Sequence, residues 1–303
     1  MKLAVIGGAG LLGSTTAFYA GTKDIFDEIK LVDIKENVLK SHVMDMDQGL
    51  SSICKTKVFE ADYSGINDCN IILITASMPE TKVSSRDDYL KLNLKIVENI
   101  CSQIKNVINP NTIIINASNP VDPLNLYMFK MLKIKREKII GFNLNDTVRF
   151  KYFISEVTKK DILSVDAYCL GEHGETKVPI FSQIKCNNEE MKLSNAQKEI
   201  INLKMINWFK EYQSLDSKRT AGWTSAIGLT KILNAITNNT KEVIPCSAVL
   251  KGEYGISDVS LGIPAKISNE GIDEIIEIEI SENEKKLLQK SSSKIKEMVK
   301  SII

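Results

Sequence analysis

The sequence has 303 residues, of which 43% are hydrophobic and 25% charged, with a formal net charge of +1. Such a composition is typical of a globular protein with room for two domains. The balanced charge, without a basic run, argues against nucleic acid as a partner. No apolar stretch approaches a membrane span, and the N-terminal apolar run stops at Gly7, so we expect a cytoplasmic protein without a membrane partner.

The first half alternates short apolar runs with longer amphipathic segments. The runs are rich in Val, Ile and Leu, which is typical of strands buried on both faces. Between them lie segments such as 85–106, where apolar residues recur at helical spacing. This alternation predicts a Rossmann-type, doubly wound parallel sheet, hence an α/β fold. The predicted strands are 2–7, 29–34, 70–76, 112–118 and 138–142.

The second half has a different rhythm, which predicts antiparallel strands and long helices. Ser281 and Glu284 form a capping box that opens a last helix ending at about residue 301. We therefore expect two closely packed domains, a Rossmann-type doubly wound domain at 1–142 and an α+β domain at 143–303. The second domain's predicted strands and helices cover 163–171, 178–185, 194–213, 221–238, 242–250, 259–267 and 273–281.

A glycine-rich turn follows the first predicted strand. Gly8, Gly10 and Gly13 have the G-x-G-x-x-G spacing, with a helix after them, and Asp33 ends the second strand. Such glycines let the backbone approach a pyrophosphate at the helix N-terminus. A carboxylate at the position of Asp33 binds ribose hydroxyls and repels a 2′-phosphate, so NAD is favoured over NADP.

The chain holds only two histidines and six widely spaced cysteines. His173 lies in the glycine-framed segment "CLGEHGETKVP" and is the main candidate for proton transfer, because imidazole titrates near neutrality. His42, on a predicted helix, is interpreted as structural, and Cys169 as a buried thiol. Without a C-x-x-C pair we expect neither a metal site nor disulfides.

Several motifs in order resemble the lactate/malate dehydrogenase family. They are "SSRDDYLKLN" (84–93), "NPVDPLNLY" (119–127), "NDTVRF" (145–150), "GEHGE" (171–175) and "GEYGISD" (252–258). The resemblance runs from residue 1 to the C-terminal helix. It implies an NAD-dependent L-2-hydroxyacid dehydrogenase, closest to lactate dehydrogenase, that takes a small 2-oxo or 2-hydroxy acid and forms a homodimer or homotetramer.

The resemblance also implies roles for five residues. His173 resembles the catalytic acid and base, and Asp146 its carboxylate partner. Arg149 resembles the arginine that grips the substrate carboxylate with two prongs. Arg86 resembles the arginine of a closing loop that polarises the substrate carbonyl, and Asn119 a residue beside both nicotinamide and substrate.

The same resemblance identifies the residues expected to contact NAD. They comprise the glycine turn and the residues just after it, the carboxylate after the second strand, polar or small residues near the ends of later strands, and Asn93 in the helical segment 85–106. The full set is Gly8, Gly10, Leu11, Leu12, Gly13, Asp33, Thr75, Ala76, Asn93 and Asn119.

The segment before Arg86 departs from the family pattern. Glu80 stands where lactate enzymes carry glutamine and malate enzymes arginine. A carboxylate that points into the pocket would repel malate's second carboxylate. If Glu80 points outward, Thr81 or Lys82 lines the pocket, and Lys82 would allow a dicarboxylate.

Two further stretches depart from the pattern. Asn145 replaces a usual leucine, in a stretch one residue shorter than is typical. The stretch "AGWTSAIGL" (221–229) is also a residue short, so either Trp223 or Thr224 faces the substrate; Thr224 is our candidate. Malate dehydrogenase and a dehydrogenase of bulky 2-hydroxy acids remain alternatives, and so does a catalytically silent NAD-binding sensor or scaffold.

Overall fold

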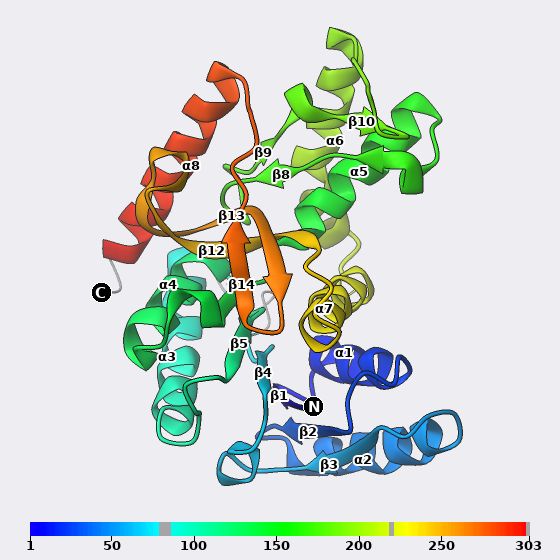
Figure 1. Ribbon diagram of the computed structural model, residues 1–303, viewed down its shortest axis with the longest axis vertical. Coiled ribbons are helices and arrows are strands. Elements are labelled where there is room, and N and C mark those ends of the chain that lie inside the picture. The colour runs from blue at the N-terminus through cyan, green and yellow to red at the C-terminus, as the bar shows by residue number, and fades with distance from the viewer. Residues whose placement is uncertain (79–85, 218–220, 301–303) are drawn as a thin grey trace.

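The computed structural model describes residues 1–78, 86–217 and 221–300, and within this part the strands form one nine-stranded sheet and two small ones. The order of the large sheet is β14-β13-β12-β6-β5-β4-β1-β2-β3 (Figure 1). Its six strands β3-β2-β1-β4-β5-β6 are parallel. This is the doubly wound order in which two halves diverge from β1 and β4.

Five of the six parallel strands occur where the sequence predicts them. They are almost fully buried, because helices cover both faces of a parallel sheet. The sixth, β3, was not predicted: three of its four residues are exposed, and it lies at the sheet edge, so it has no apolar run. The strands are β1 (Lys2–Ile6), β2 (Glu28–Val32), β3 (Lys57–Glu60), β4 (Ile71–Ile74), β5 (Ile113–Asn116) and β6 (Ile139–Gly141).

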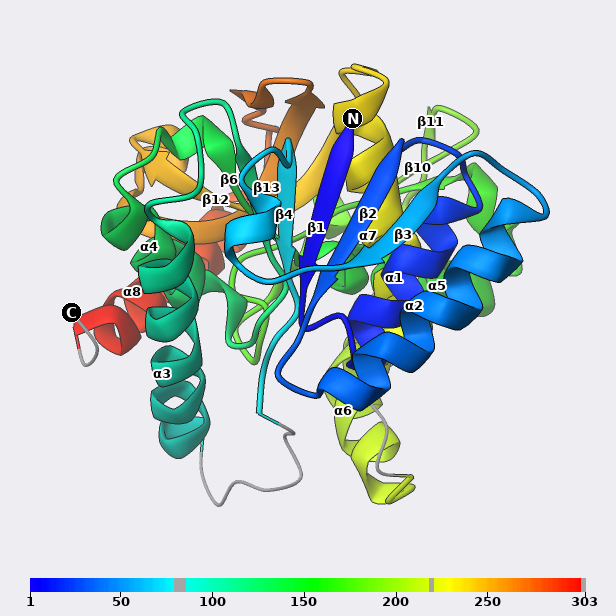
Figure 2. The same ribbon diagram turned by 90° about the horizontal axis from the view of Figure 1, so that it is seen from below.

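Helices cover the parallel sheet on both sides. Figure 2 shows α1 and α2 on one face and α3 and α4 on the other. The amphipathic segment predicted at 85–106 is α3. The helices of the first half are α1 (Leu11–Gly21), α2 (Glu36–Ser51), α3 (Arg86–Ile104) and α4 (Val121–Leu132), with 3-10 turns at Ser64–Ile66 and Arg136–Lys138.

The second half contributes antiparallel strands, as predicted, and three of them extend the parallel sheet. β12 pairs with β6 through Ser247 and Gly141. The contact is close, since a Cβ on Gly141 would lie 2.7 Å from the Cβ of Ser247. These three strands are β12 (Val243–Lys251), β13 (Ser257–Ser268) and β14 (Gly271–Ile275).

The remaining elements of the second half pack around this extension. The expected boundary at residue 142 falls between β6 and α5. The helices are α5 (Leu144–Thr158), α6 (Asn195–Ser214), α7 (Gly222–Thr237) and α8 (Glu282–Lys300). The short strands are β7 (Val165–Asp166), β8 (Cys169–Leu170), β9 (Val178–Pro179), β10 (Lys185–Cys186) and β11 (Glu189–Glu190), with 3-10 turns at Ile162–Ser164, Phe181–Gln183 and Glu253–Gly255.

The strand predicted at 273–281 is too long, because β14 ends at Ile275. Beyond Ile275, the Tyr254 hydroxyl forms hydrogen bonds with the backbone of this segment. It donates to Ile276 O at 2.9 Å and accepts from Ile278 N at 3.0 Å. Alternating burial therefore continues without a partner strand, which is why the period-2 pattern misled the prediction.

The predicted capping box at the last helix is confirmed. Glu284 accepts the backbone N–H of Ser281 at 2.8 Å, and Ser281 Oγ accepts that of Glu284 at 3.4 Å. Glu284 also accepts the Ser182 hydroxyl at 2.5 Å, which fixes α8 against the segment after β9. In the described part of the chain, no helix has the length and apolarity needed to cross a membrane.

Candidate active site

The turn between β1 and α1 depends on a glycine that the predicted motif left out. Gly7 has φ +94°, and a Cβ there would lie 2.7 Å from both Ala76 N and Thr75 Oγ1. Gly7 and Gly8 both donate to the carbonyl of Val32. Gly7 therefore makes the tight bend. Its positive φ is visible only in the folded structure, so the sequence spacing could not identify it.

The same turn leaves the start of α1 open to an anion. Gly10 is the N-cap and offers no side-chain cap. A Cβ on Gly13 would lie 2.3 Å from Gly7 O, so α1 packs directly on the turn. Uncapped N–H groups at a helix start attract phosphate. The turn therefore fits the pyrophosphate of a dinucleotide.

Asp33 lies at the end of β2, half-buried beside this turn. Its Oδ2 accepts the N–H of Ala9 at 3.0 Å and its Oδ1 that of Lys35 at 3.0 Å. Next to it, residues 34–38 line an open hollow of about 320 Å³. His42, on α2, has Nδ1 3.4 Å from Gly8 O, consistent with its structural interpretation.

The other predicted cofactor residues surround the ends of β4 and β5. Thr75 Oγ1 donates to Ile6 O at 3.1 Å, holding β4 to β1. Asn93 is fully buried, and its Oδ1 accepts the N–H of Met78 at 2.8 Å. Ala76 and Asn119 are half-buried at strand ends on the same side.

His173 and Asp146 lie together, as the sequence predicts. His173 follows β8, and its Nδ1 is 2.5 Å from Oδ2 of Asp146 on the first turn of α5. The aspartate side chain is only 2% exposed. Because Nδ1 faces the carboxylate, Nε2 is left for a substrate.

Two cations share the other oxygen of Asp146. Lys177 Nζ is 3.1 Å and Arg149 Nη1 3.5 Å from Oδ1. Burial alone would raise the pKa of Asp146, but the opposite charges of His173 and Lys177 outweigh it and hold the pKa well below its usual range. Lys177 was not among the predicted site residues.

Arg149 is held by an aromatic ring that the sequence analysis did not identify. Its guanidinium lies over the ring of Trp208, on α6, 3.7 Å from the centroid. Burial lowers the pKa of Arg149. Because a guanidinium that stacks by its face keeps its N–H groups at the edge, Arg149 can contact Trp208 and a carboxylate together.

A second buried carboxylate anchors the backbone of His173. Asp122 Oδ2 accepts the His173 N–H at 2.7 Å, and Oδ1 accepts the Ser247 hydroxyl at 2.5 Å. Ser260 extends this network to Asn125. Burial raises the pKa of Asp122 to about 7, against the lowering effect of the two hydrogen bonds. Asp122 stands within "NPVDPLNLY", but no pattern in the sequence shows that it contacts His173.

The start of α7 brings the remaining candidates to the site. A Cβ on Gly222 would lie 3.1 Å from Leu11 Cγ, so α7 abuts the glycine turn. Ser225 Oγ accepts a hydrogen bond from Nδ2 of Asn145 at 2.7 Å, and this bond joins α7 to α5. Between them Thr224 is half-buried, whereas Trp223 is 64% exposed.

Two predicted residues cannot be placed against this arrangement. Glu80 lies outside the described residues, with Thr81 and Lys82. Arg86 is the first residue of α3, but its side chain lies outside the described part of the structure. Cys169, buried in β8, has its pKa raised by burial, and its backbone N–H and C=O both bond the Thr147 hydroxyl, as expected of a structural thiol.

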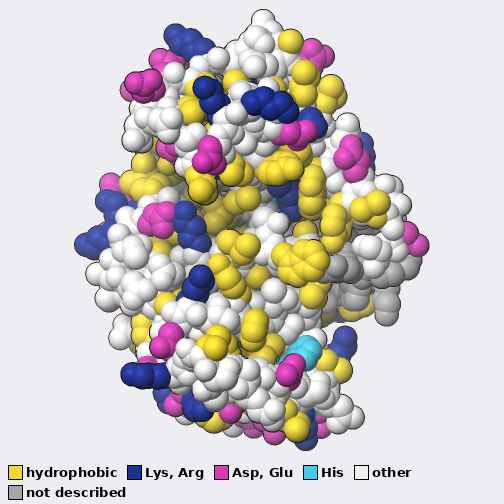
Figure 3. Space-filling model, turned by 90° about the vertical axis from the view of Figure 1, so that its right-hand side faces the viewer, with side chains coloured by type: hydrophobic (Ala, Val, Ile, Leu, Met, Phe, Trp, Pro, Cys, Tyr) yellow, Lys and Arg dark blue, Asp and Glu magenta, His cyan; other side chains and the backbone are white. Residues whose placement is uncertain are grey.

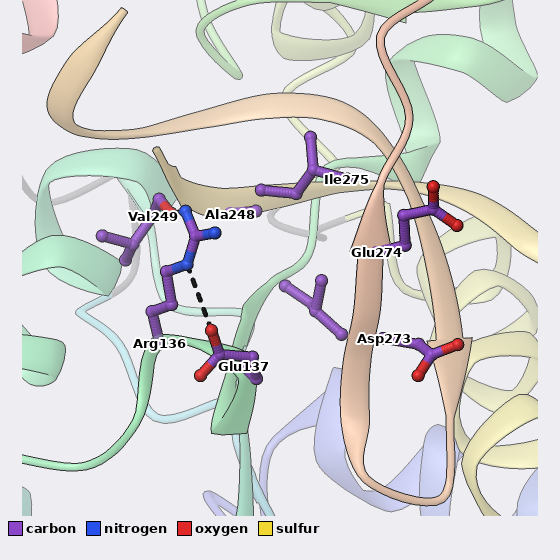
Figure 4. A pocket seen from close by; sticks show the side chains of 8 residues that line it. Arg136, Glu137, Ala248, Val249, Asp273, Glu274 and Ile275 are labelled. Atoms are coloured by element: carbon purple, nitrogen blue, oxygen red, sulfur yellow. Dashed lines mark hydrogen bonds and ion pairs between the residues drawn. The ribbon is translucent and has the colours of Figure 1, made fainter. Parts of the chain in front are cut away.

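A small hollow lies elsewhere, between the hairpin strands and the Arg136–Lys138 turn (Figure 4). Its volume is about 50 Å³, and none of the predicted site residues lines it. Arg136 faces Glu137 across 3.1 Å and also binds Glu253 at 2.8 Å. Its charge is thus paired, and the hollow is too small for a substrate.

Comparison with known proteins gives matches over the whole chain. Residues 1–141 match the NAD-binding domain of lactate/malate dehydrogenase, and residues 144–303 its α/β C-terminal domain. Malate dehydrogenase of Halobacterium salinarum is 32% identical, over 97% of both chains. L-lactate dehydrogenase of Acetivibrio thermocellus is 30% identical, over 100% of this chain and 98% of its own.

Solved structures give the same result. Malate dehydrogenase of Cryptosporidium parvum superposes with a TM-score of 0.93 at 27% identity, covering 99% of this chain and 98% of its own. Lactate dehydrogenase of the same organism, complexed with lactic acid and NAD, gives 0.91 at 26% identity, covering 99% and 97%.

Asp122→Asn should change how stability depends on pH. Because the folded protein binds the Asp122 proton more tightly than the unfolded chain, this group's contribution to stability falls as pH rises from about 4 to about 7. In the variant, the free energy of unfolding should no longer show this decrease. Urea unfolding at pH 5 and pH 8 measures it. Asp258→Asn, at an exposed position, is the control. If the free energy of unfolding changes between pH 5 and pH 8 by the same amount in Asp122→Asn as in the wild-type protein, the raised pKa assigned to Asp122 is wrong.

Proposed function

Since this chain belongs to the lactate/malate dehydrogenase family, and so is an NAD-dependent 2-hydroxyacid dehydrogenase, we propose that it prefers small 2-oxo monocarboxylates of the pyruvate and L-lactate type. The observation that carries the reaction is the triad of His173, Asp146 and Arg149, in which Asp146 contacts both partners; the preference for a monocarboxylate rests on the sequence at position 80. Such a triad supplies a proton and a carboxylate grip in one pocket.

In this proposal His173 moves the proton. During reduction, its Nε2 gives a proton to the carbonyl oxygen; during oxidation, the same nitrogen takes the proton from the hydroxyl. Asp146 fixes the ring through Nδ1 and stabilises the imidazolium. Bound NAD(H) supplies or accepts the hydride. Asp122 holds the backbone of His173 in place.

Arg149 is assigned the substrate carboxylate. Its edge faces the pocket side of Asp146 while its face rests on Trp208, so the guanidinium is oriented before substrate binds. Arg86 is assigned to the carbonyl from the start of α3, Asn119 to the space between nicotinamide and substrate, and Thr224 to the substrate side of α7. The half-burial of Thr224, against the exposure of Trp223, supports this last choice.

The assigned NAD contacts follow the turn and the strand ends. The glycine turn and the start of α1, with Gly8, Gly10, Leu11, Leu12 and Gly13, would hold the pyrophosphate, and Asp33 the ribose hydroxyls. Thr75, Ala76, Asn93 and Asn119 would line the nicotinamide side. The boundary between the cofactor and substrate domains is proposed at residues 142 and 143.

The preference for a monocarboxylate rests on the sequence at position 80, because a carboxylate there that faces the substrate would repel a second substrate carboxylate. Oxaloacetate is the second candidate. It is favoured by the malate dehydrogenase of H. salinarum, which is 32% identical. A reducing, cytoplasmic setting is also proposed, and the six free thiols support it.

We also propose that the chain forms a homodimer or homotetramer. Hydrophobic side chains gather on the face that carries α6, α7 and α1 (Figure 3). Large exposed apolar residues of these three helices include Phe18, Ile206, Phe209, Trp223 and Ile227, exposed by 38% to 64%. An apolar surface across three helices is typical of an interface, and a second copy of the chain is its proposed occupant.

A panel of 2-oxo acids tests the reaction and the substrate. NADH oxidation should be fastest with pyruvate or another monocarboxylate and slower with oxaloacetate. His173→Asn should lower kcat by about 10²–10⁴-fold, because the proton donor is lost, while NADH binding, followed by fluorescence, persists. His42→Asn is the matched control and should keep turnover. NADH binding without reduction of any acid would instead indicate a sensor or scaffold.

Light scattering tests the oligomer. We expect two or four times the 33.8 kDa of one chain. Ile227→Glu should give a smaller species, since a charge would be buried at the interface. Leu163→Glu, at a position 89% exposed on another element, should leave the mass unchanged. A monomeric wild-type protein would rule out the assembly.

A further inference from the structure

Lys177 is a charged side chain next to Asp146 to which the proposed function gives no role. It lies four residues after His173, in the same bend between β8 and β9. Its Nζ is 3.1 Å from Oδ1 of Asp146, closer than Arg149 at 3.5 Å. Its side chain is only 20% exposed, so solvent screens this contact weakly.

Asp146 thus shares one negative charge among an imidazole and two cations. Oδ2 faces the imidazole, and Oδ1 faces Lys177 and Arg149. A cation on Oδ1 competes with the imidazolium for the carboxylate and also repels it. Lys177 therefore opposes the effect of Asp146 on His173.

The other charged groups nearby are already engaged. Glu172 binds the Thr176 hydroxyl at 2.5 Å and Lys294 at 3.2 Å, so it does not neutralise Lys177. Asp122 accepts the backbone N–H of His173, and its charge and that of the His173 ring also influence each other. The buried thiol of Cys169 lies close enough to Asp146 and Lys177 for their charges to influence it. Lys177 is thus paired with Asp146 among the described groups.

We propose that Lys177 is a positioning residue that holds Oδ1 of Asp146, and so sets the pH range in which His173 can carry its proton. It does so in two ways. It draws carboxylate charge away from the imidazole, which moves reduction of the 2-oxo acid to lower pH. It also remains as the partner of Oδ1 when Arg149 turns its edge to the substrate carboxylate. This inference rests on the proposed roles of His173 and Arg149.

Lys177→Met tests the inference, because it removes the charge but keeps most of the chain length. With the competing cation gone, the imidazolium is better stabilised, so the alkaline limb of kcat/KM for 2-oxo acid reduction should move up by about 0.5–1 pH unit. Lys177→Arg retains the charge and should keep the wild-type limb. A limb that does not move in Lys177→Met overturns the inference, and so does a rise in KM that is equal at every pH, which would make Lys177 a substrate contact.

A second readout needs no turnover. Diethyl pyrocarbonate modifies neutral imidazole, and peptide masses separate His173 from His42. The midpoint for modification of His173 should rise in Lys177→Met by the same amount, with His42 unchanged. An unshifted His173 midpoint would contradict the role of Lys177 whatever the substrate, whereas loss of turnover in the wild-type protein alone would contradict only the proposed function.

Discussion

The site is organised around one buried negative charge. The side chain of Asp146 is 2% exposed and meets an imidazole on one oxygen and two cations on the other. A carboxylate buried this deeply is tolerated only when opposite charges and hydrogen bonds replace its water. These contacts join the first turn of α5 to the bend after β8 and orient the ring of His173.

The extended sheet supplies the frame that holds this arrangement. β12 pairs with β6, which places Ser247 over the start of α4 and within reach of Asp122. Asp122, from the first half of the chain, then holds the backbone of His173, from the second. Gly171 and Gly262 exchange backbone hydrogen bonds and fix the end of β8 on β13. His173, the proposed proton-transfer residue, is thus anchored by both halves.

Much of this was predictable from sequence, because it is written in local patterns. Buried parallel strands give apolar runs, and the ordered motifs identify His173, Asp146 and Arg149. Contacts made only by the folded chain left no such pattern. Lys177 looks like an ordinary turn residue until folding brings it to Asp146, and Trp208 looks like an ordinary helix residue until folding brings it to Arg149. Gly7 was missed because the motif spacing could be read from Gly8. The alternation after Ile275 reflects packing against Tyr254 rather than a strand.

The central claim is that Asp146 holds the imidazole of His173 with Nδ1 protonated and Nε2 presented to substrate. Nitrogen-15 NMR of the ring nitrogens tests it directly, because the chain has only two histidines. For the neutral ring of His173, the account predicts the Nδ1–H tautomer in the wild-type protein, its loss in Asp146→Asn, and an unchanged His42 signal. An Nε2–H tautomer in the wild-type protein, or a His173 signal indifferent to Asp146→Asn, would contradict it.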